Sequence, residues 1–213
     1  MIEPGTLYNS IATEFDRDRN KSLMEGDYLR AVLSRIPRRA EILDLGCGTG
    51  EPIARFFIEA GCRVTGVDAA PAMLAMSRER FPAMTWLQHD MRSLALGRRF
   101  AAIVAWDSFF HLTADDQRGM FPVFEQHIAP RGLLLFTSGP GAGVAIGEIY
   151  GHELFHASLH AGEYERLLNA HGFDVLLHRV EDPRCGNHTV WLAQQKSGQA
   201  AAEPTRPPRG HRR

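Results

Sequence analysis

Three glycines at alternate positions constrain the fold of this chain more than any other feature of its sequence. They lie in the segment Glu41-Ile-Leu-Asp-Leu-Gly-Cys-Gly-Thr-Gly50, where an apolar run typical of a buried strand leads directly into the glycines. Gly46, Gly48 and Gly50 allow the backbone to turn sharply and to approach a flat ligand, which a Cβ would hold away. A stretch with helical periodicity follows at about 51–60. The segment therefore predicts a strand, a ligand-binding loop and a helix.

Strand and helix patterns alternate along most of the chain. Apolar strand-like runs occur at about 40–45, 62–67, 84–88, 101–106 and 132–137, and helical periodicity at about 51–60, 71–80 and 113–128. This alternation predicts a doubly wound α/β fold with a mostly parallel, seven-stranded sheet covered on both faces. After a helix at about 161–171, strands at about 173–181 and 187–194 are expected to complete the sheet as a C-terminal antiparallel hairpin.

Two further segments fall outside the alternation. Residues 1–35 are expected to form helices that cover the carboxyl edge of the sheet. The glycine-rich run from Gly139 to Gly147 lacks the Gly-Lys-Ser/Thr ending of a phosphate-binding loop, and a plain loop or a lid is expected there.

Two aspartates near the glycine loop indicate what kind of ligand it binds. Asp68 ends the second strand, where an acid can accept hydrogen bonds from both hydroxyls of an adenosine ribose. Asp44 precedes the loop by two residues, and a buried carboxylate there repels a pyrophosphate but attracts an ammonium or sulfonium group. The alternate glycines also differ from the G-x-G-x-x-G spacing of dinucleotide sites. A cationic ligand is therefore favoured over a phosphorylated one.

At this point the sequence resembles the class I S-adenosylmethionine-dependent methyltransferases, and the resemblance covers residues 5–195 in order of elements. Ile42-Leu-Asp-Leu-Gly-Cys-Gly-Thr-Gly50 is similar to the first motif of that family. Tyr8-Asn-x-Ile-Ala-x-x-Phe15-Asp16 resembles the amino-terminal motif of many small members, whose aromatic residues close over the cofactor, although Phe15 replaces a tyrosine. The resemblance implies a Rossmann-like fold, S-adenosyl-L-methionine as cofactor and methyl transfer as the activity.

The resemblance also implies cofactor-binding residues. The segment from Asp44 to Gly50 would hold the methionine part, Asp68 the ribose, and Ala69 and Met73 the adenine. Gln88-His-Asp90-Met91 and Val104-Ala-Trp106-Asp107 match the third- and fourth-strand motifs. The implied cofactor-binding residues are Tyr8, Asp44, Gly46, Cys47, Gly48, Gly50, Asp68, Ala69, Met73, Asp90, Met91 and Trp106.

Methyl transfer from a sulfonium is an in-line displacement, so the protein mainly supplies alignment and a dry site. A general base is needed only where the acceptor loses a proton, and His111 is the first candidate because it follows the carboxyl end of the fourth strand. Asp107, His111, Tyr150 and His156 are expected to bind the acceptor. A packing role for His111 remains an alternative.

His152, His156 and His160 have a spacing that would align them on one face of a helix, which raises the alternative of a metal site. Gly151 and the absence of an HExxH motif argue against it, and no metal is expected.

Composition restricts the remaining possibilities. The chain has 213 residues, of which 44% are hydrophobic and 23% charged, as in a single globular domain, expected to span residues 1–195. Its 24 cationic and 25 acidic side chains nearly cancel, which gives no reason to expect a nucleic-acid or membrane partner. Residues 196–213 carry five basic and one acidic side chain among many prolines and are expected to be a disordered basic tail.

Cys47, Cys62 and Cys185 form no CxxC pair and are odd in number, which favours the reducing cytoplasm. The leading hypothesis is a methyltransferase for a small-molecule acceptor, as a monomer or homodimer. The alternatives are a methyltransferase for protein or RNA, a cofactor-binding protein without turnover, and a dehydrogenase.

Overall fold

A computed structural model of the chain describes residues 2–197. Its main element is the expected seven-stranded sheet, with strand order β3-β2-β1-β4-β5-β9-β8. The parallel strands are β1 (Glu41–Leu45), β2 (Arg63–Asp68), β3 (Thr85–Gln88), β4 (Phe100–Ala105) and β5 (Ile128–Ser138). The predicted C-terminal hairpin consists of β8 (Phe173–Asp182) and β9 (His188–Gln195), with β9 antiparallel to β5. The predicted doubly wound fold is confirmed.

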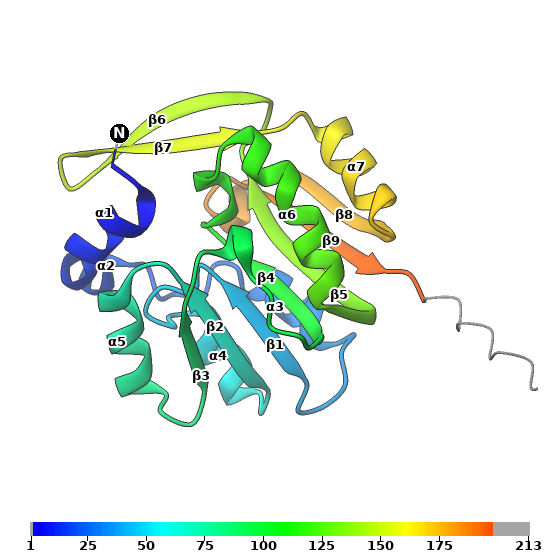
Figure 1. Cartoon of the computed structure of the whole chain (residues 1–213), viewed down its shortest axis with the longest axis horizontal. Coiled ribbons are helices and arrows are strands. Elements are labelled where there is room, and N and C mark those ends of the chain that lie inside the picture. Colours follow the sequence, from blue (N-terminus) through cyan, green and yellow to red (C-terminus); the bar gives the residue numbers. More distant parts are fainter. Residues whose placement is uncertain (1, 198–213) are drawn as a thin grey trace, which may run out of the picture.

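Helices cover both faces of this sheet (Figure 1). One face packs against α3 (Gly26–Leu33), α4 (Ile53–Glu59) and α5 (Pro71–Arg80), and the other against α6 (Ala114–His127) and α7 (Ala161–Ala170). Successive strand residues point to opposite faces, so Ile42 belongs to the first core and Leu43 to the second. This two-sided burial explains why the central strands are apolar throughout.

Only part of the N-terminal segment covers the carboxyl edge of the sheet, as predicted for all of it. Helices α1 (Pro4–Ser10) and α2 (Ala12–Asp18) lie at the carboxyl edge of the parallel strands, as expected (Figure 1). Helix α3 instead packs on a face of the sheet, because Tyr28, Leu29 and Val32 form an apolar stripe that is buried in the first core. The prediction of an edge cover is therefore wrong for α3.

The glycine-rich run after β5 is a β-hairpin and not a plain loop. Strand β6 (Gly143–Ile149) pairs antiparallel with β7 (His152–Ser158), and the two form a separate ribbon above the carboxyl edge of the main sheet (Figure 1). The glycines obscured a strand pattern carried by Val144, Ile146 and Ile149. The ribbon is held down by Leu154, which packs against Leu7 of α1.

The structure also shows that His152, His156 and His160 do not align on one face of a helix. His152 and His156 lie on β7, and His160 is the N-cap of α7. In the described residues, no group of three or more side chains could hold a metal ion. None of the described helices is long and apolar enough to cross a membrane. The predicted basic tail falls almost entirely outside the described residues, of which only Lys196 and Ser197 belong to it.

Candidate active site

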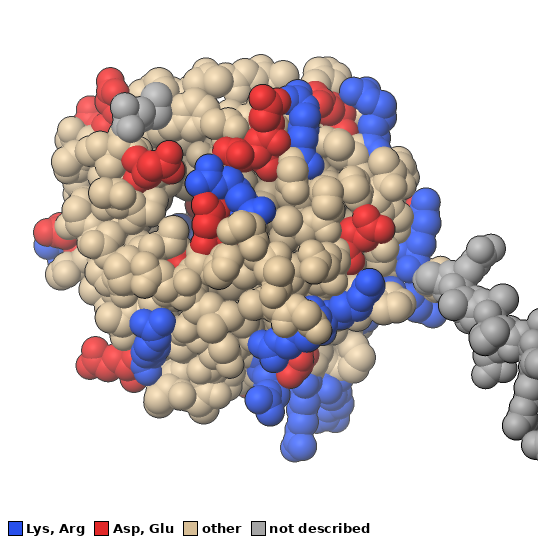
Figure 2. Space-filling model, viewed as in Figure 1, with Lys and Arg blue, Asp and Glu red and all other residues tan. Residues whose placement is uncertain are grey.

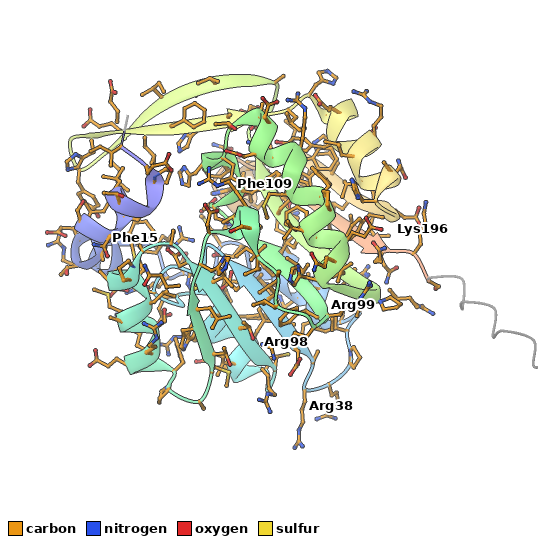
Figure 3. All side chains as sticks on the ribbon, viewed as in Figure 1. Phe15, Arg38, Arg98, Arg99, Phe109 and Lys196 are labelled. Atoms are coloured by element: carbon orange, nitrogen blue, oxygen red, sulfur yellow. The ribbon has the colours of Figure 1, made fainter. Side chains whose placement is uncertain are left out.

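The carboxyl ends of β1, β2 and β4 meet at one edge of the sheet, beside a cavity of about 630 Å³. The chain reverses its winding between β1 and β4, and ligands of doubly wound folds bind at such a point. Helices α1 and α2 and strand β7 close the cavity from above, and Figure 3 labels Phe15 on α2 at this edge. The site is therefore assembled from segments at both ends of the chain and in its middle.

The glycine loop forms the floor of the cavity in the conformation that its sequence predicts. Gly46 has a φ of +73°, and a Cβ at this position would lie only 2.2 Å from the Cβ of Ser108. Gly48 has a φ of +53° and no atom lies within 4 Å of where its Cβ would be, so the backbone is bare toward the cavity. Glycine is the only residue that adopts these positive φ angles without strain and that also leaves room for Ser108 beside position 46.

Asp68 ties the loop to the end of β2. Its Oδ2 atom accepts a hydrogen bond from the Gly48 N–H at 2.8 Å, and its Oδ1 atom accepts one from the Ala70 N–H, also at 2.8 Å. Burial raises the pKa of Asp68, although these backbone donors oppose the rise. Asp68 thus fixes the position of the loop and lies on the cavity wall.

Asp44 is the least compensated charge of the site. Its side chain is 3% exposed, faces the cavity and has no hydrogen-bond or ion-pair partner among the described residues. Burial, followed by the charge of Asp68, raises its pKa to about 7, while Arg19 opposes the rise. A cationic group placed in the cavity would stabilise the Asp44 carboxylate.

His111 adopts a defined tautomer because of its two partners. Its Nδ1 atom lies 3.1 Å from the carbonyl oxygen of Phe155, which can only accept, so Nδ1 carries the proton. Its Nε2 atom lies 3.1 Å from the Tyr8 hydroxyl and accepts from it. Burial lowers the pKa of His111 to about 4, so the ring is uncharged at neutral pH.

Sequence reasoning missed two cations on the cavity wall. Arg19, just after α2, donates to Oδ2 of Asp107 at 3.2 Å, and His188, at the start of β9, donates from Nε2 to Oδ1 at 2.8 Å. The Nδ1 atom of His188 lies 2.7 Å from the carbonyl oxygen of Cys185. Both ring nitrogens therefore face acceptors, and the ring carries two protons. No sequence motif indicated either residue, because the contacts span 88 and 81 positions.

The end of the cavity beneath β7 is lined by rings. His156 lies 5.0 Å from His111 and 5.0 Å from Phe110 between ring centroids, and Tyr8 lies 5.5 Å from His111. Phe110 was not among the predicted site residues. The aromatic residues on either side of it, Phe109 and His111, show from the sequence that rings are concentrated here, but the sequence does not show which ring faces the cavity. Phe109 does not, because it lies in the core beneath α6 (Figure 3).

Most predicted site residues do line this cavity. They are Tyr8, Asp44, Gly46, Cys47, Gly48, Asp68, Ala69, Met73, Asp90, Met91, Trp106, Asp107, His111 and His156. Gly50 lies outside the lining and contributes to the turn. Tyr150 also lies outside it, because its hydroxyl donates to the Glu14 carbonyl and to Asp18 at 3.0 Å each. It secures α2 to the ribbon and does not reach the acceptor end.

Residues 42–132, which include the glycine loop and both aspartates, match the sequence profile of a family described as a methyltransferase domain. The central part of the chain is thus similar to methyltransferase domains. This match supports the resemblance to the class I S-adenosylmethionine-dependent methyltransferases that the glycine motif indicated, over a dehydrogenase.

Curated relatives of this chain act on different small molecules according to their names. It is 32% identical over 121 residues to the dTDP-3-amino-3,4,6-trideoxy-alpha-D-glucopyranose N,N-dimethyltransferase of Streptomyces venezuelae, covering 56% of this chain and 51% of the relative. It is 32% identical over 114 residues to a trans-aconitate 2-methyltransferase of an Azoarcus species, covering 49% and 42%. The chain thus spans about half the length of the curated relatives it matches.

Solved structures resemble this chain over almost their whole length. A SAM-bound amino pentose methyltransferase from Micromonospora echinaspora has a TM-score of 0.69 at 20% identity and covers 88% of this chain and 96% of that one. A 1,6-didemethyltoxoflavin N1-methyltransferase from Burkholderia thailandensis has a TM-score of 0.66 at 20% identity, with 92% coverage of both chains. At this identity the likeness establishes the fold.

Proposed function

We propose that this chain binds S-adenosyl-L-methionine and transfers its methyl group to a small-molecule acceptor. The observation that carries the proposal is the buried, unpartnered carboxylate of Asp44 beside the bare backbone of Gly48. S-adenosylmethionine carries an ammonium and a sulfonium group, and the Asp44 carboxylate complements either charge. The donor set therefore fits the cofactor.

The remaining cofactor assignments follow the order of the strands. Asp68 ends β2 and Ala69 follows it, where the ribose would lie, and Met73, which is 1% exposed, offers apolar surface to the adenine. Asp90 and Met91 follow β3 on the adenine side, and Trp106 follows β4 on the side of the reactive methyl group. Arg19 has N–H donors besides the one bound to Asp107, and these suit the cofactor carboxylate.

The cofactor supplies an activated methyl group, so the chain itself must align the acceptor, exclude water and, where necessary, accept a proton. Tyr8 of α1 and His156 of β7 close the cavity over the ring-lined end. His111 is the proposed proton acceptor for an acceptor hydroxyl or amine, because its Nε2 atom holds a lone pair at neutral pH. Asp107 and His156 complete the acceptor end.

A small acceptor is favoured over protein or RNA by the cover on the cavity. Helix α1, helix α2 and the β6–β7 ribbon cover part of the cavity, which leaves a partly open space of about 630 Å³ for cofactor and acceptor together. The names of the relatives, which refer to a dTDP-linked amino sugar, trans-aconitate and 1,6-didemethyltoxoflavin, support the same proposal.

We further propose that this methyltransferase acts in the cytoplasm as a monomer or homodimer, without a nucleic-acid or membrane partner. Cys47, Cys62 and Cys185 are free and buried in the structure, as suits a reducing compartment. The near balance of cationic and acidic residues supports the absence of a polyanionic partner.

Calorimetric titration of the cofactor tests the proposal. Wild-type chain is expected to bind S-adenosylmethionine and S-adenosylhomocysteine, and Asp44→Asn to lose most of the affinity for both. Methyl release over a panel of phenols, amines, acids and RNA then separates an enzyme from a binding protein. Absence of binding to either form of the cofactor would refute both functions.

A further inference from the structure

Acids outnumber cations on the wall of the cavity. Seven Asp and Glu residues line it against two arginines and the protonated His188. Figure 2 shows an opening into the molecule with acidic and basic side chains on its rim, whereas basic side chains gather at the lower edge. Arg38, Arg98 and Arg99 lie at that opposite edge (Figure 3). The chain thus holds many of its cations away from the cavity, whose walls favour positive charge.

The cations that do reach the cavity are already paired. Arg19 and the protonated His188 both hydrogen-bond to Asp107. Arg92 donates from Nη1 to Asp116 at 3.2 Å and binds Asp90 through its other nitrogens. Arg19 keeps further N–H donors, which are assigned to the cofactor carboxylate under the proposed function. Among the described residues that line the cavity, no unshared arginine or lysine remains for a phosphate or carboxylate group on the acceptor.

The entrance adds negative charge. Glu3, at the N-cap of α1, is exposed and lines the cavity, and its carboxylate has no hydrogen-bond or ion-pair partner in the described part of the chain. Asp116, in the first turn of α6, also lines the cavity, with a side chain that is 33% exposed and that shares Arg92 with Asp90. An approaching ammonium group would be attracted by Glu3 and by the two carboxylates that share a single arginine, and an anion repelled.

The ring-lined end can accept an ammonium group and remove its proton. The faces of Tyr8 and Phe110 attract a cation, and the neighbouring imidazoles of His111 and His156 are uncharged at neutral pH because burial lowers the pKa of both. The Nε2 atom of His111 holds a lone pair, which accepts from the Tyr8 hydroxyl and can take a proton from the ammonium group in its place. His156 has no hydrogen-bond partner for its ring within the described residues, so it is available to bind the ammonium group beside His111.

We infer that the acceptor is an amine that carries no phosphate or carboxylate group beside the nitrogen, and this inference rests on the proposed function. The inference is based on two features of the cavity: the acidic residues Glu3 and Asp116 on its wall, and the uncharged imidazoles of His111 and His156 under β7. Amino sugars linked to a nucleotide, such as the one in the name of the Streptomyces venezuelae relative, would bring a diphosphate for which this cavity offers no unshared cation.

An N–H bond of the bound ammonium would break, its proton would form a new bond to the Nε2 atom of His111, and the amine would keep the electron pair. That pair would form the N–CH₃ bond, while the electron pair of the S–CH₃ bond of the sulfonium donor would remain on sulfur. The products would be a methylammonium, a neutral thioether and a protonated His111.

Four probes that differ only in the polar group test the inference. The chain is first saturated with S-adenosylhomocysteine, and benzylamine, benzyl alcohol, phenylacetate and benzyl phosphate are then titrated calorimetrically at neutral pH. Benzylamine is expected to bind about tenfold or more tightly than either anion, a difference that corresponds to about 1.4 kcal/mol. Equal or tighter binding of an anion, or no saturable binding of benzylamine at millimolar concentration, overturns the inference.

Two variants and a matched control locate the effect. Glu3→Gln and Asp116→Asn are each expected to weaken benzylamine binding about threefold and to leave benzyl alcohol unchanged. Asp115→Asn is the control, because Asp115 adjoins Asp116 in sequence but is 97% exposed and outside the cavity lining. An equal loss in the control would assign the effect to general surface charge. Failure to bind S-adenosylhomocysteine would instead refute the proposed function, and the inference with it.

Discussion

His188 binds the carboxylate of Asp107 at 2.8 Å while its other ring nitrogen donates to a backbone carbonyl, so the histidine is held in its charged form. The hydrogen bond to Asp107 raises the pKa of His188. Asp107 itself has a φ of +49°, a backbone angle that is unfavourable for a residue with a side chain. The ion pair therefore holds a strained residue in the wall of the active site.

This pair should stabilise the fold in a pH-dependent way. Because the pKa of His188 is raised in the folded chain, its contribution is complete below the unfolded value of about 6.5 and is lost as the pH rises through the folded value. His188→Ala is expected to lower the free energy of unfolding by about 2 kcal/mol at pH 6 and by less at pH 9. Urea denaturation at both pH values measures this, and an equal loss at both would contradict it.

Cofactor affinity should depend on the ionisation of Asp44. Its pKa of about 7 means that a cationic cofactor binds a carboxylate that is half protonated at neutral pH. The dissociation constant of S-adenosylmethionine is expected to rise about tenfold for each pH unit below 6. Calorimetry from pH 5 to 8 measures the slope. Asp44→Asn removes the titrating group, so a variant that retained the slope would disprove this origin.

The same residue should reduce stability in the absence of ligand. A carboxyl whose folded pKa is raised favours its protonated form in the fold, so the ionised form destabilises the chain increasingly as the pH rises from about 4 to 7. Asp44→Asn is expected to increase the free energy of unfolding by on the order of 2–4 kcal/mol at pH 8, while affinity for the cofactor falls. The gain should disappear at pH 4, and its persistence there would point to another cause.

A single methyl group at Gly46 should disrupt the loop. The added Cβ of Gly46→Ala would lie 2.2 Å from Ser108, and the φ of +73° adds backbone strain. We expect a loss of more than about 2 kcal/mol in unfolding free energy together with loss of cofactor binding. Gly61→Ala is the control, since its φ is +83° but no atom lies within 4 Å, so it should cost only about 1 kcal/mol.

His111 should affect turnover more than cofactor affinity. With an acceptor found in the methyl-release panel, His111→Ala is expected to lower kcat about a hundredfold or more and to change the dissociation constant of the cofactor little. Its pKa of about 4 places no titration of His111 between pH 6 and 8. Unchanged turnover would leave His111 with a packing role, held between Tyr8 and Phe155.

The sequence correctly predicted the parts of the molecule that depend on residues close together in the chain. The alternation around Ile42 and Leu43, the glycine loop and the acid that ends β2 all follow from neighbouring residues. The ribbon of β6 and β7 was missed because glycines at 143 and 147 weaken strand propensity and its pairing depends on register across a turn.

The charged partners of the site were missed for a different reason. Arg19 and His188 are separated from Asp107 by 88 and 81 residues, and nothing in their local sequence distinguishes them from surface side chains. Tyr150 was wrongly predicted to bind the acceptor, because its hydroxyl instead hydrogen-bonds to Glu14 and Asp18 of α2. Side-chain direction depends on tertiary packing that local patterns do not record.

The contact between His188 and Asp107 can form only late in the synthesis of the chain. Asp107 emerges from the ribosome long before His188, which lies near the end of the described chain, and Tyr8 emerges before either. A nascent chain that has completed β4 therefore has its glycine loop and Arg19, but it lacks His188, the second cation that binds Asp107. The wall of the active site is complete only when β9 has been added to the sheet.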